Sequence, residues 1–507
     1  MRDLADGSVA VVSGASNYPG IAPFGPPEAY PEFVITPRDL DPSNRVYPMV
    51  RQALHLLGLD AARFGIPAWN PLGEIISPGH RVLLKPNWVL HFNAGGGPLE
   101  AVVTHAAVLR PVVDYVLLAL KGRGELIIGD APQMNCDLSE LFRRNGMRDL
   151  IPYLQEACGN AGVKLSIQDF RLEQTTYRAA IVWKRKRLRE RDNSTVPVIL
   201  GKESFMEGID VTRLYGADYG RAHTVRAHLG NRHEYRIAAE VLSSDVIISL
   251  PKLKVHSKVG TTLNIKNMVG TNTDKNHLAH YRVGPPSRGG DELSRAHWLD
   301  MTERTLSDTL LGHYWALGKY PFLLWKGFRA VLAQFQKPST APFSFGNWHG
   351  NDTAWRMALD LNRVVLTADK EGQFSRKPLR GYFSLIDGIV AGQGNGPLHP
   401  EPYPCGVVLA GFNPVAVDWV ATWLMGLDPR RMKMYTNAVT QMRGWVLDFS
   451  IERCRVVSNV PAWEHLLSST EPIFRFEPAP GWRGTIERHP TPVEPLETIA
   501  AADPLGQ

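Results

Sequence analysis

Cysteine is scarce in this chain. Its 507 residues include four cysteines, Cys136, Cys158, Cys405 and Cys454, and they are too widely spaced to form a Cys-x-x-Cys pair. The spacing argues against a zinc ribbon, a ferredoxin-type cluster and a dense disulfide framework. We therefore expect other polar side chains to carry the chemistry of the protein.

Long apolar runs are absent as well. No stretch of about 18 uncharged apolar residues is present, as a membrane-spanning helix would need, and no apolar core follows the arginine near the N-terminus, as a secretory signal would need. We therefore expect a cytoplasmic protein, with peripheral contact to the inner face of the membrane as an alternative. Lys and Arg number 56 against 50 Asp and Glu, a net charge of +6. This mild excess favours an anionic small molecule or a membrane surface, and nucleic acid is an unlikely partner because no recognised module is present. The oligomeric state is open.

Short β-branched segments alternate with helical patterns in the first half of the chain. The patterns predict strands over 9–12, 81–84, 125–128, 163–167 and 245–250, and helices over 47–59, 104–120 and 138–157. Such alternation is typical of βαβ units. We therefore predict an α/β fold, Rossmann-like, in which a mostly parallel sheet has helices on both faces and carries inserted helical segments.

The chain is long enough for several structural units. We predict an N-terminal α/β half over 1–180, a basic insertion over 181–235, a central strand–loop–helix motif over 236–275, a helical insertion over 276–375, a C-terminal α/β part over 376–460 and a Pro-rich tail over 461–507. The basic run 183–191 is either a solvated excursion or a contact for anionic lipid or nucleic acid. The apolar segment 313–334 is either a core helix or a helix that lies on a membrane.

Polar residues follow several predicted strands, and in a parallel sheet the carboxyl ends of the strands share one ligand-binding edge. Lys85 and Asn87 follow the second strand, and Thr104 and His105 precede a helix that Thr104 would cap. Asp130 follows the third strand and is expected either to bind a metal or hydroxyl group or to cap a turn.

The strongest motif runs from residue 244 to residue 270. Lys252, Lys254 and His256 alternate along the predicted strand, so they share one face if the strand continues past Pro251. Lys266 and Asn267 add a cation and an amide. So many donors suit a phosphate or a carboxylate. The lysines should lower the proton affinity of His256, which favours a neutral imidazole as a base or metal ligand.

A further strand is predicted to end at Asp387-Gly388 and to be followed by a Gly-rich loop that includes Asn395. Asp387 would hold a cation or a sugar hydroxyl. Asp130, Asp387 and His256 are thus the candidate ligands of a divalent metal ion, whose identity is open. His277 and His280 lie three residues apart and could bind a metal ion together from one face of a helix. No carboxylate stands at the spacing that would be diagnostic of such a site.

These motifs resemble the domain-of-unknown-function 362 family. The resemblance rests on Lys85-Pro86-Asn87, Gly129-Asp130-Ala131, residues 245–256 and 260–270, Asp387-Gly388, residues 394–397 and residues 411–418. Gln393 departs from the acidic residue expected there. A weaker likeness to the central region of nickel-dependent lactate racemases implies that His256 transfers a proton and Lys266 anchors the cofactor, although Asn264-Ile265 replaces an expected double Gly.

We therefore expect a metal-assisted enzyme that acts on an anionic small molecule bearing phosphate or carboxylate. His256, Lys266 and Asp130 are the candidate catalytic residues. The candidate binding residues are Lys85, Asn87, His105, Lys252, Lys254, Asn267 and Asn395. The alternatives are a non-catalytic protein that binds an anion or lipid in a membrane-associated pathway, and a racemase or epimerase acting on a hydroxy acid.

Overall fold

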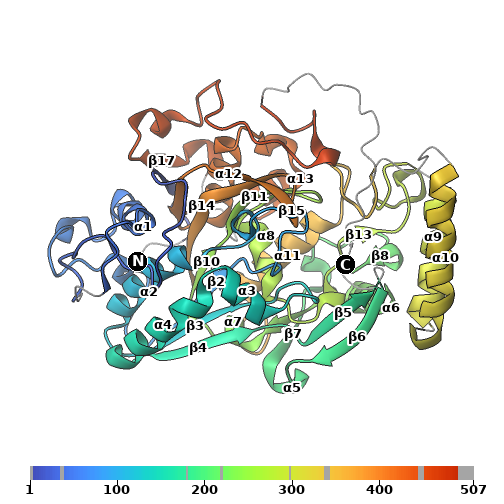
Figure 1. Ribbon diagram of the computed structural model, residues 1–507, viewed down its shortest axis with the longest axis horizontal. Helices are drawn as coiled ribbons and strands as arrows, with labels where there is room; N and C mark the ends of the chain where they lie inside the picture. Colours follow the sequence, from blue (N-terminus) through green and yellow to red (C-terminus); the bar gives the residue numbers. More distant parts are fainter. Residues whose placement is uncertain are drawn as a thin grey trace.

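One large mixed β-sheet forms the centre of the fold. The computed structural model describes residues 4–34, 39–178, 181–216, 221–295, 298–313, 315–335, 343–442 and 450–488 (Figure 1). In spatial order the main path of the sheet runs through β17 (Arg455–Ser458), β1 (Ser8–Ser13), β16 (Val407–Gly411), β14 (Gly381–Asn395), β10 (Val246–Leu250), β2 (Arg81–Pro86), β3 (Glu125–Asp130) and β4 (Lys164–Asp169). From β14 to β4 all neighbouring strands are parallel, whereas β16 is antiparallel to both β14 and β1.

Helices cover both faces of this sheet. Alternate residues of a strand point to opposite faces, so Val9 and Val11 enter one core cluster while Ala10 and Val12 enter the other. The second cluster includes α1 (Val46–Leu56), α2 (Ala106–Leu120), α3 (Leu138–Arg144) and α4 (Met147–Ala161). The first includes α11 (Ala354–Thr367), α12 (Pro414–Leu424) and α13 (Lys433–Gln441). The predicted α/β class with a mostly parallel sheet is confirmed.

Two predicted helices differ in detail from those in the structure. The helix predicted over 138–157 is divided into α3 and α4 by Gly146, whose φ of 81° is left-handed and breaks the helix. The prediction that Thr104 caps α2 is wrong. His105 is the N-cap, its Nδ1 accepting from the backbone N–H of Ala107, while the Thr104 hydroxyl accepts from the N–H of Asn87 and donates to the carbonyl of Leu250.

The prediction of a Gly-rich loop after Asp387 is also wrong, because β14 continues as a strand to Asn395. Its later part pairs with β15 (His399–Tyr403) and β11 (Lys252–His256), and β11 pairs with β12 (Gly260–Thr262). The glycines permit close packing within the sheet. A Cβ at Gly388 would lie 2.7 Å from Val407 Cγ2, and one at Gly392 would lie 2.6 Å from the carbonyl oxygen of Ala101.

Smaller elements extend from one end of the sheet. They include three two-stranded pairs: β5 (Glu173–Arg178) with β6 (Ile181–Arg187), β7 (Thr195–Ile199) with β9 (Glu234–Ala238), and β8 (Leu214–Tyr215) with β13 (Tyr281–Arg282). The short helices are α5 (Arg191–Ser194), α6 (Arg221–His228), α7 (Ala239–Leu242) and α8 (Asn264–Asn267). Within the predicted helical insertion, α9 (Trp298–His313) and α10 (Trp315–Phe335) form a hairpin that stands at the right-hand edge of Figure 1. Among the described segments, no helix combines the length and the hydropathy needed to cross a membrane.

The predicted Pro-rich tail begins as ordered chain. Backbone hydrogen bonds join Phe474 to Leu424, Phe476 to Met425 and Asp428 to Ile486, so this segment packs on the end of α12. Residues 489–507 of the predicted tail lie outside the described residues, as does residue 314 of the predicted apolar segment.

Candidate functional site

Strand β11 carries the strongest motif of the sequence into the interior. The chain leaves β10 at Leu250, passes Pro251 and continues as a second strand, β11. Leu253 and Val255 enter the apolar core, and the intervening side chains of Lys252, Lys254 and His256 are buried as well. Buried cations need partners, because an uncompensated charge is costly in a protein interior. The partners divide these residues into two groups.

Lys252 belongs to a buried ion pair. Its Nζ lies 3.1 Å from Asp387 Oδ2, and it donates to the hydroxyl oxygen of Tyr18 at 2.5 Å. The Tyr18 hydroxyl in turn donates to Asp387 Oδ1 at 2.6 Å, and the backbone N–H of His105 donates to Asp387 Oδ2 at 3.0 Å. The His105 ring stacks on the Tyr18 ring at 4.1 Å, and burial lowers the pKa of His105 to about 4. His105 is therefore neutral near pH 7, and Asp387 is held by its neighbours.

Lys85 forms a second pair of the same kind at the end of β2. Its Nζ lies 2.7 Å from Asp130 Oδ1, and the backbone N–H of Trp88 donates to Asp130 Oδ2 at 2.6 Å. Asn267 accepts from Lys85 Nζ through Oδ1 and donates through Nδ2 to the carbonyl oxygen of Lys85. Gly270 closes over the pair so tightly that a Cβ there would lie 1.9 Å from Asp130 Oδ1. These contacts fix Lys85 and Asp130 to each other.

The predicted metal ligands do not form a metal site in this arrangement. Asp130 and Asp387 each pair with a lysine, which supplies the positive charge that a metal ion would bring. Across the part of the chain that the structure describes, no three His, Cys, Asp or Glu side chains are placed to share an ion. The residues present therefore do not fit a divalent metal at Asp130, Asp387 and His256.

The second group gathers around Lys266, which α8 carries. We call Lys254, His256, Lys258, Lys266 and His280 the lysine–histidine cluster, because the charge of Lys258 or of Lys266 lowers the pKa of each of the other members. Lys254 Nζ donates to the carbonyls of Val102 and Pro397, and Lys258 Nζ donates to Asn347 Oδ1 and to the carbonyl of Phe345. The three lysines thus bring cationic groups close to two buried histidines.

Lys266 differs from the other lysines of the cluster. Its side chain makes no hydrogen bond or ion pair with the residues that the structure describes, and only 8% of the residue is exposed. Burial, followed by the charge of Lys258, lowers the pKa of Lys266 to about 7. Among the described residues, the amino group of Lys266 therefore has no counter-charge beside it, although most of the side chain is buried. An external anion would supply one.

The two histidines of the cluster are held in opposite tautomers. His256 Nδ1 accepts from the backbone N–H of Lys258 at 3.0 Å, so the neutral ring carries its proton on Nε2. His280 Nδ1 lies 2.9 Å from the carbonyl oxygen of Leu278, which can only accept, so that ring carries its proton on Nδ1. Burial, followed by the neighbouring lysine charges, holds the pKa of each histidine well below its usual value. His256 thus offers a donor at Nε2, and His280 offers a lone pair there.

Asp418 fixes the helix that carries Lys266. Its carboxylate accepts from the backbone N–H and the Nδ2 of Asn264 and from the backbone N–H of Ile265, at 2.8–2.9 Å. Burial raises the pKa of Asp418 to about 7. These contacts give Asp418 a supporting role toward α8.

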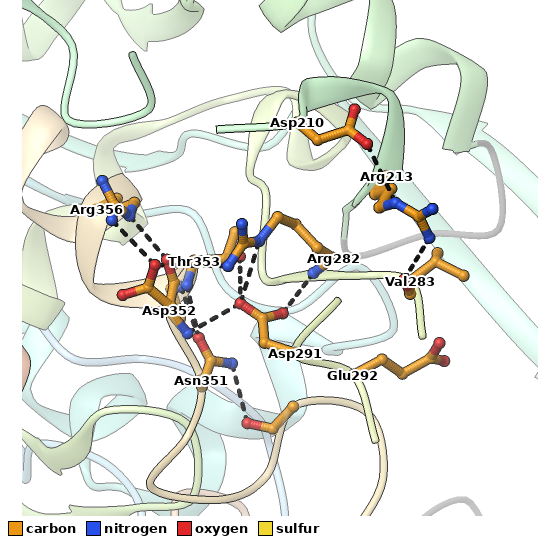
Figure 2. Close-up of polar contacts among 12 residues, drawn as sticks. Asp210, Arg213, Arg282, Val283, Asp291, Glu292, Asn351, Asp352, Thr353 and Arg356 are labelled. Atoms are coloured by element: carbon orange, nitrogen blue, oxygen red, sulfur yellow. Dashed lines mark hydrogen bonds and ion pairs between the residues drawn. The ribbon is translucent and has the colours of Figure 1, made fainter. Parts of the chain in front are cut away.

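Asp291 fixes the segment that carries His280. Figure 2 shows the Asp291 carboxylate between Arg282 and the segment 351–353. It accepts from the backbone N–H of Arg282 at 2.5 Å and from the hydroxyl of Thr353 at 2.7 Å. Asn351 Nδ2 then donates to the carbonyl oxygen of His280 at 3.0 Å. Two separate carboxylates, Asp291 and Asp418, therefore support the segments that carry His280 and Lys266.

The other predicted binding residues lie in different surroundings. Asn87 is buried, and its Oδ1 has no hydrogen-bond partner among the described residues. Asn267 contacts the Lys85 pair, as described above, whereas Asn395 is exposed at the end of β14. Lys258 and His280 were not among the predicted site residues. Lys258 had a signal in its closeness to His256, whereas His280 attracted notice only for its spacing from His277 and joins the cluster through the folding of a distant segment.

Comparisons with known proteins add a family but no activity. A family model described as "Domain of unknown function (DUF362)" matches residues 82–170 and 186–423. A thylakoid-associated protein of Synechocystis sp. is 22% identical over 358 residues, which cover 71% of this chain and 67% of that protein. The chain is also similar to a crystal structure of a Thermotoga maritima protein, with 10% sequence identity and a TM-score of 0.27. The match covers 69% of this chain and 54% of that one. Nothing in these comparisons supports the resemblance to nickel-dependent lactate racemases.

Proposed function

The chain belongs to the DUF362 family, as its motifs predicted, and we propose that it is an enzyme acting on an anionic small molecule. The anion, a carboxylate or a phosphate, binds at the lysine–histidine cluster. The observation that carries this proposal is the largely buried side chain of Lys266, whose amino group has no partner among the described residues and lies near the charge of Lys258. A binding site for an anion explains why the fold keeps such an unfavourable arrangement of charge.

The proposed roles follow from the donors of the cluster. Lys266 forms the ion pair with the bound anion, and the Nε2–H of His256 donates a hydrogen bond to it. Both residues retain a little contact with solvent, 8% for Lys266 and 6% for His256. The lone pair on His280 Nε2 then serves as general base, while the Nε2–H of His256 remains a hydrogen-bond donor to the charge that develops on the substrate. Acid–base chemistry beside a carboxylate or phosphate is the reaction class that this set supports.

Binding is tested by calorimetric titration with inorganic phosphate and with lactate. Lys266→Met should weaken the binding of the preferred anion by about tenfold to a hundredfold, the usual loss for a hydrogen bond to a charged group. The matched control is Lys370→Met, which removes one exposed lysine far from the cluster in sequence and should bind as the wild type does. Equal affinity in wild type and Lys266→Met would contradict the proposed site.

Catalysis is tested separately from binding. The protein is incubated in heavy water with candidate hydroxy acids, and deuterium incorporation beside the carboxylate is followed by NMR. His256→Ala and His280→Ala should each abolish exchange while retaining much of the anion affinity, because Lys266 remains. Binding without any exchange or turnover over a broad set of carboxylates and phosphates would leave a non-catalytic anion-binding protein and overturn the enzymatic part of the proposal.

A further inference from the structure

The outer face of α10 is apolar along most of its length. Its exposed residues recur at spacings of three and four, so they form one continuous stripe. Leu317 and Leu324 are each 77% exposed and Phe328 is 55% exposed. We call this surface the α10 stripe; it comprises Leu317, Tyr320, Pro321, Leu324, Gly327, Phe328 and Val331. Single exposed apolar residues are common, but a contiguous set of them marks an interaction surface.

The inner face of α10 is satisfied by α9. Phe322 is buried there against Leu306 and Leu310. Lys326 and Arg329 both pair with Glu303 of α9, with 3.5 Å between Lys326 Nζ and Glu303 Oε1. The helix therefore packs both apolar side chains and paired charges against α9, and it presents a second apolar face to solvent, where an ordinary surface helix is polar. The hairpin stands at the right-hand edge of the molecule in Figure 1, where the stripe is accessible.

A basic strand lies beside the α10 stripe. The Trp183 ring of β6 contacts the Tyr320 ring at a centroid distance of 6.3 Å, and Lys319 Nζ lies 4.2 Å from the Trp183 ring. From Trp183 the strand continues into four exposed cationic side chains, Lys184, Arg185, Lys186 and Arg187. The basic run and the apolar segment are separated by more than a hundred residues in the sequence, and the fold joins them into one surface.

We propose that this combined surface docks on an anionic lipid bilayer. The α10 stripe would enter the boundary between headgroups and acyl chains, while the cations of β6 would meet the lipid phosphates. Trp183 and Tyr320 lie between the apolar and basic parts, where aromatic side chains favour the interface. A second copy of the chain suits this surface less well, because pairing two such surfaces would bring two basic strands together. This inference is independent of the anion site.

Flotation of the full chain with vesicles tests the proposal. Vesicles of phosphatidylcholine with phosphatidylglycerol should carry the wild type upward, whereas vesicles of phosphatidylcholine alone should carry much less. The double variant Leu324→Glu with Phe328→Glu should reduce the bound fraction to the background. Leu379→Glu, at an exposed leucine outside the α10 stripe, is the matched control and should float as the wild type does.

The basic strand is tested by Lys184→Glu with Lys186→Glu. Partitioning onto anionic vesicles should fall about tenfold or more, because each basic residue near the surface contributes to the attraction. Lys370→Glu with Lys377→Glu is the control for a general loss of charge. The proposal would be overturned if the wild type failed to float or floated equally well with both vesicle types. It would also be overturned if the stripe variant changed only the oligomeric state measured by sedimentation. Unchanged phosphate affinity in the stripe variants would show that the anion site is intact.

Discussion

The unpaired charge of Lys266 should make the protein more stable as the pH rises above neutrality. The pKa of Lys266 is lowered to about 7 in the folded chain, whereas an unfolded lysine titrates near its ordinary value of 10.5. Between these values the unfolded chain binds more protons than the folded one, so the free energy of unfolding increases with pH. From about pH 7 to about pH 9, Lys266 alone should contribute about 2 kcal/mol, since one pKa unit corresponds to about 1.4 kcal/mol.

The assay is urea unfolding at a series of pH values without added anion. Lys266→Met lacks the titrating group, so its unfolding midpoint should rise less with pH than that of the wild type. Lys370→Met, at an exposed position, should follow the wild-type curve. Saturating phosphate should flatten the wild-type curve, because it stabilises the protonated Lys266 at the lower pH. Parallel curves for wild type and Lys266→Met would refute the reasoning, as would a wild-type midpoint that falls over this range.

Three further outcomes follow from the same contacts. The affinity for sulfate, which does not titrate here, should fall about tenfold per pH unit above pH 7, because binding requires the protonated Lys266; constant affinity in calorimetry would contradict this. Asp387→Asn should lower the free energy of unfolding by about 3–5 kcal/mol, because it leaves Lys252 buried without its partner, whereas Tyr18→Phe should lower it by about 1 kcal/mol. Equal urea midpoints for the two variants would contradict this. Asp418→Ala should lower the free energy of unfolding by about 1–3 kcal/mol and weaken sulfate binding, because α8 loses its support. Unchanged sulfate affinity would contradict the supporting role of Asp418.

Much of the sheet was predictable because its strands are local patterns. The β-branched runs that precede Lys85 and Asp130, and the run that precedes Lys252, each form a strand of the parallel part. The alternation of Lys252, Lys254 and His256 is equally local, but it did not predict that Lys252 pairs with Asp387 while the other two belong to the lysine–histidine cluster. Such signals depend on a few neighbouring residues, and the sequence displays them directly.

The partners of these residues were not predictable in the same way. Tyr18 and Lys252 are 234 residues apart, and their hydrogen bond arises only when the N-terminal loop folds over the sheet. The sequence treated Asp387 as a metal ligand and Lys252 as an anion ligand, whereas the structure pairs them with each other. A carboxylate at a strand end has the same sequence signature in both roles. Only the distance between the two side chains distinguishes them.

The extent of β14 was hidden for a different reason. Its glycines resemble a loop in the sequence, yet they are needed because neighbouring strands and the segment that precedes α2 approach the backbone closely. His280 was hidden because the pairing of β8 with β13 and the contacts of Asn351 carry it to the lysine–histidine cluster. Both features follow from tertiary packing, which local propensity does not encode.

The most direct test of the anion site is a crystal structure obtained in the presence of selenate, whose selenium is located by anomalous scattering. The account predicts a selenate oxygen about 3 Å from Lys266 Nζ, with a second contact to His256 Nε2. The same peak should be missing from crystals of Lys266→Met. Selenate bound only at exposed lysines, with none beside Lys266 in the wild type, would contradict the central claim.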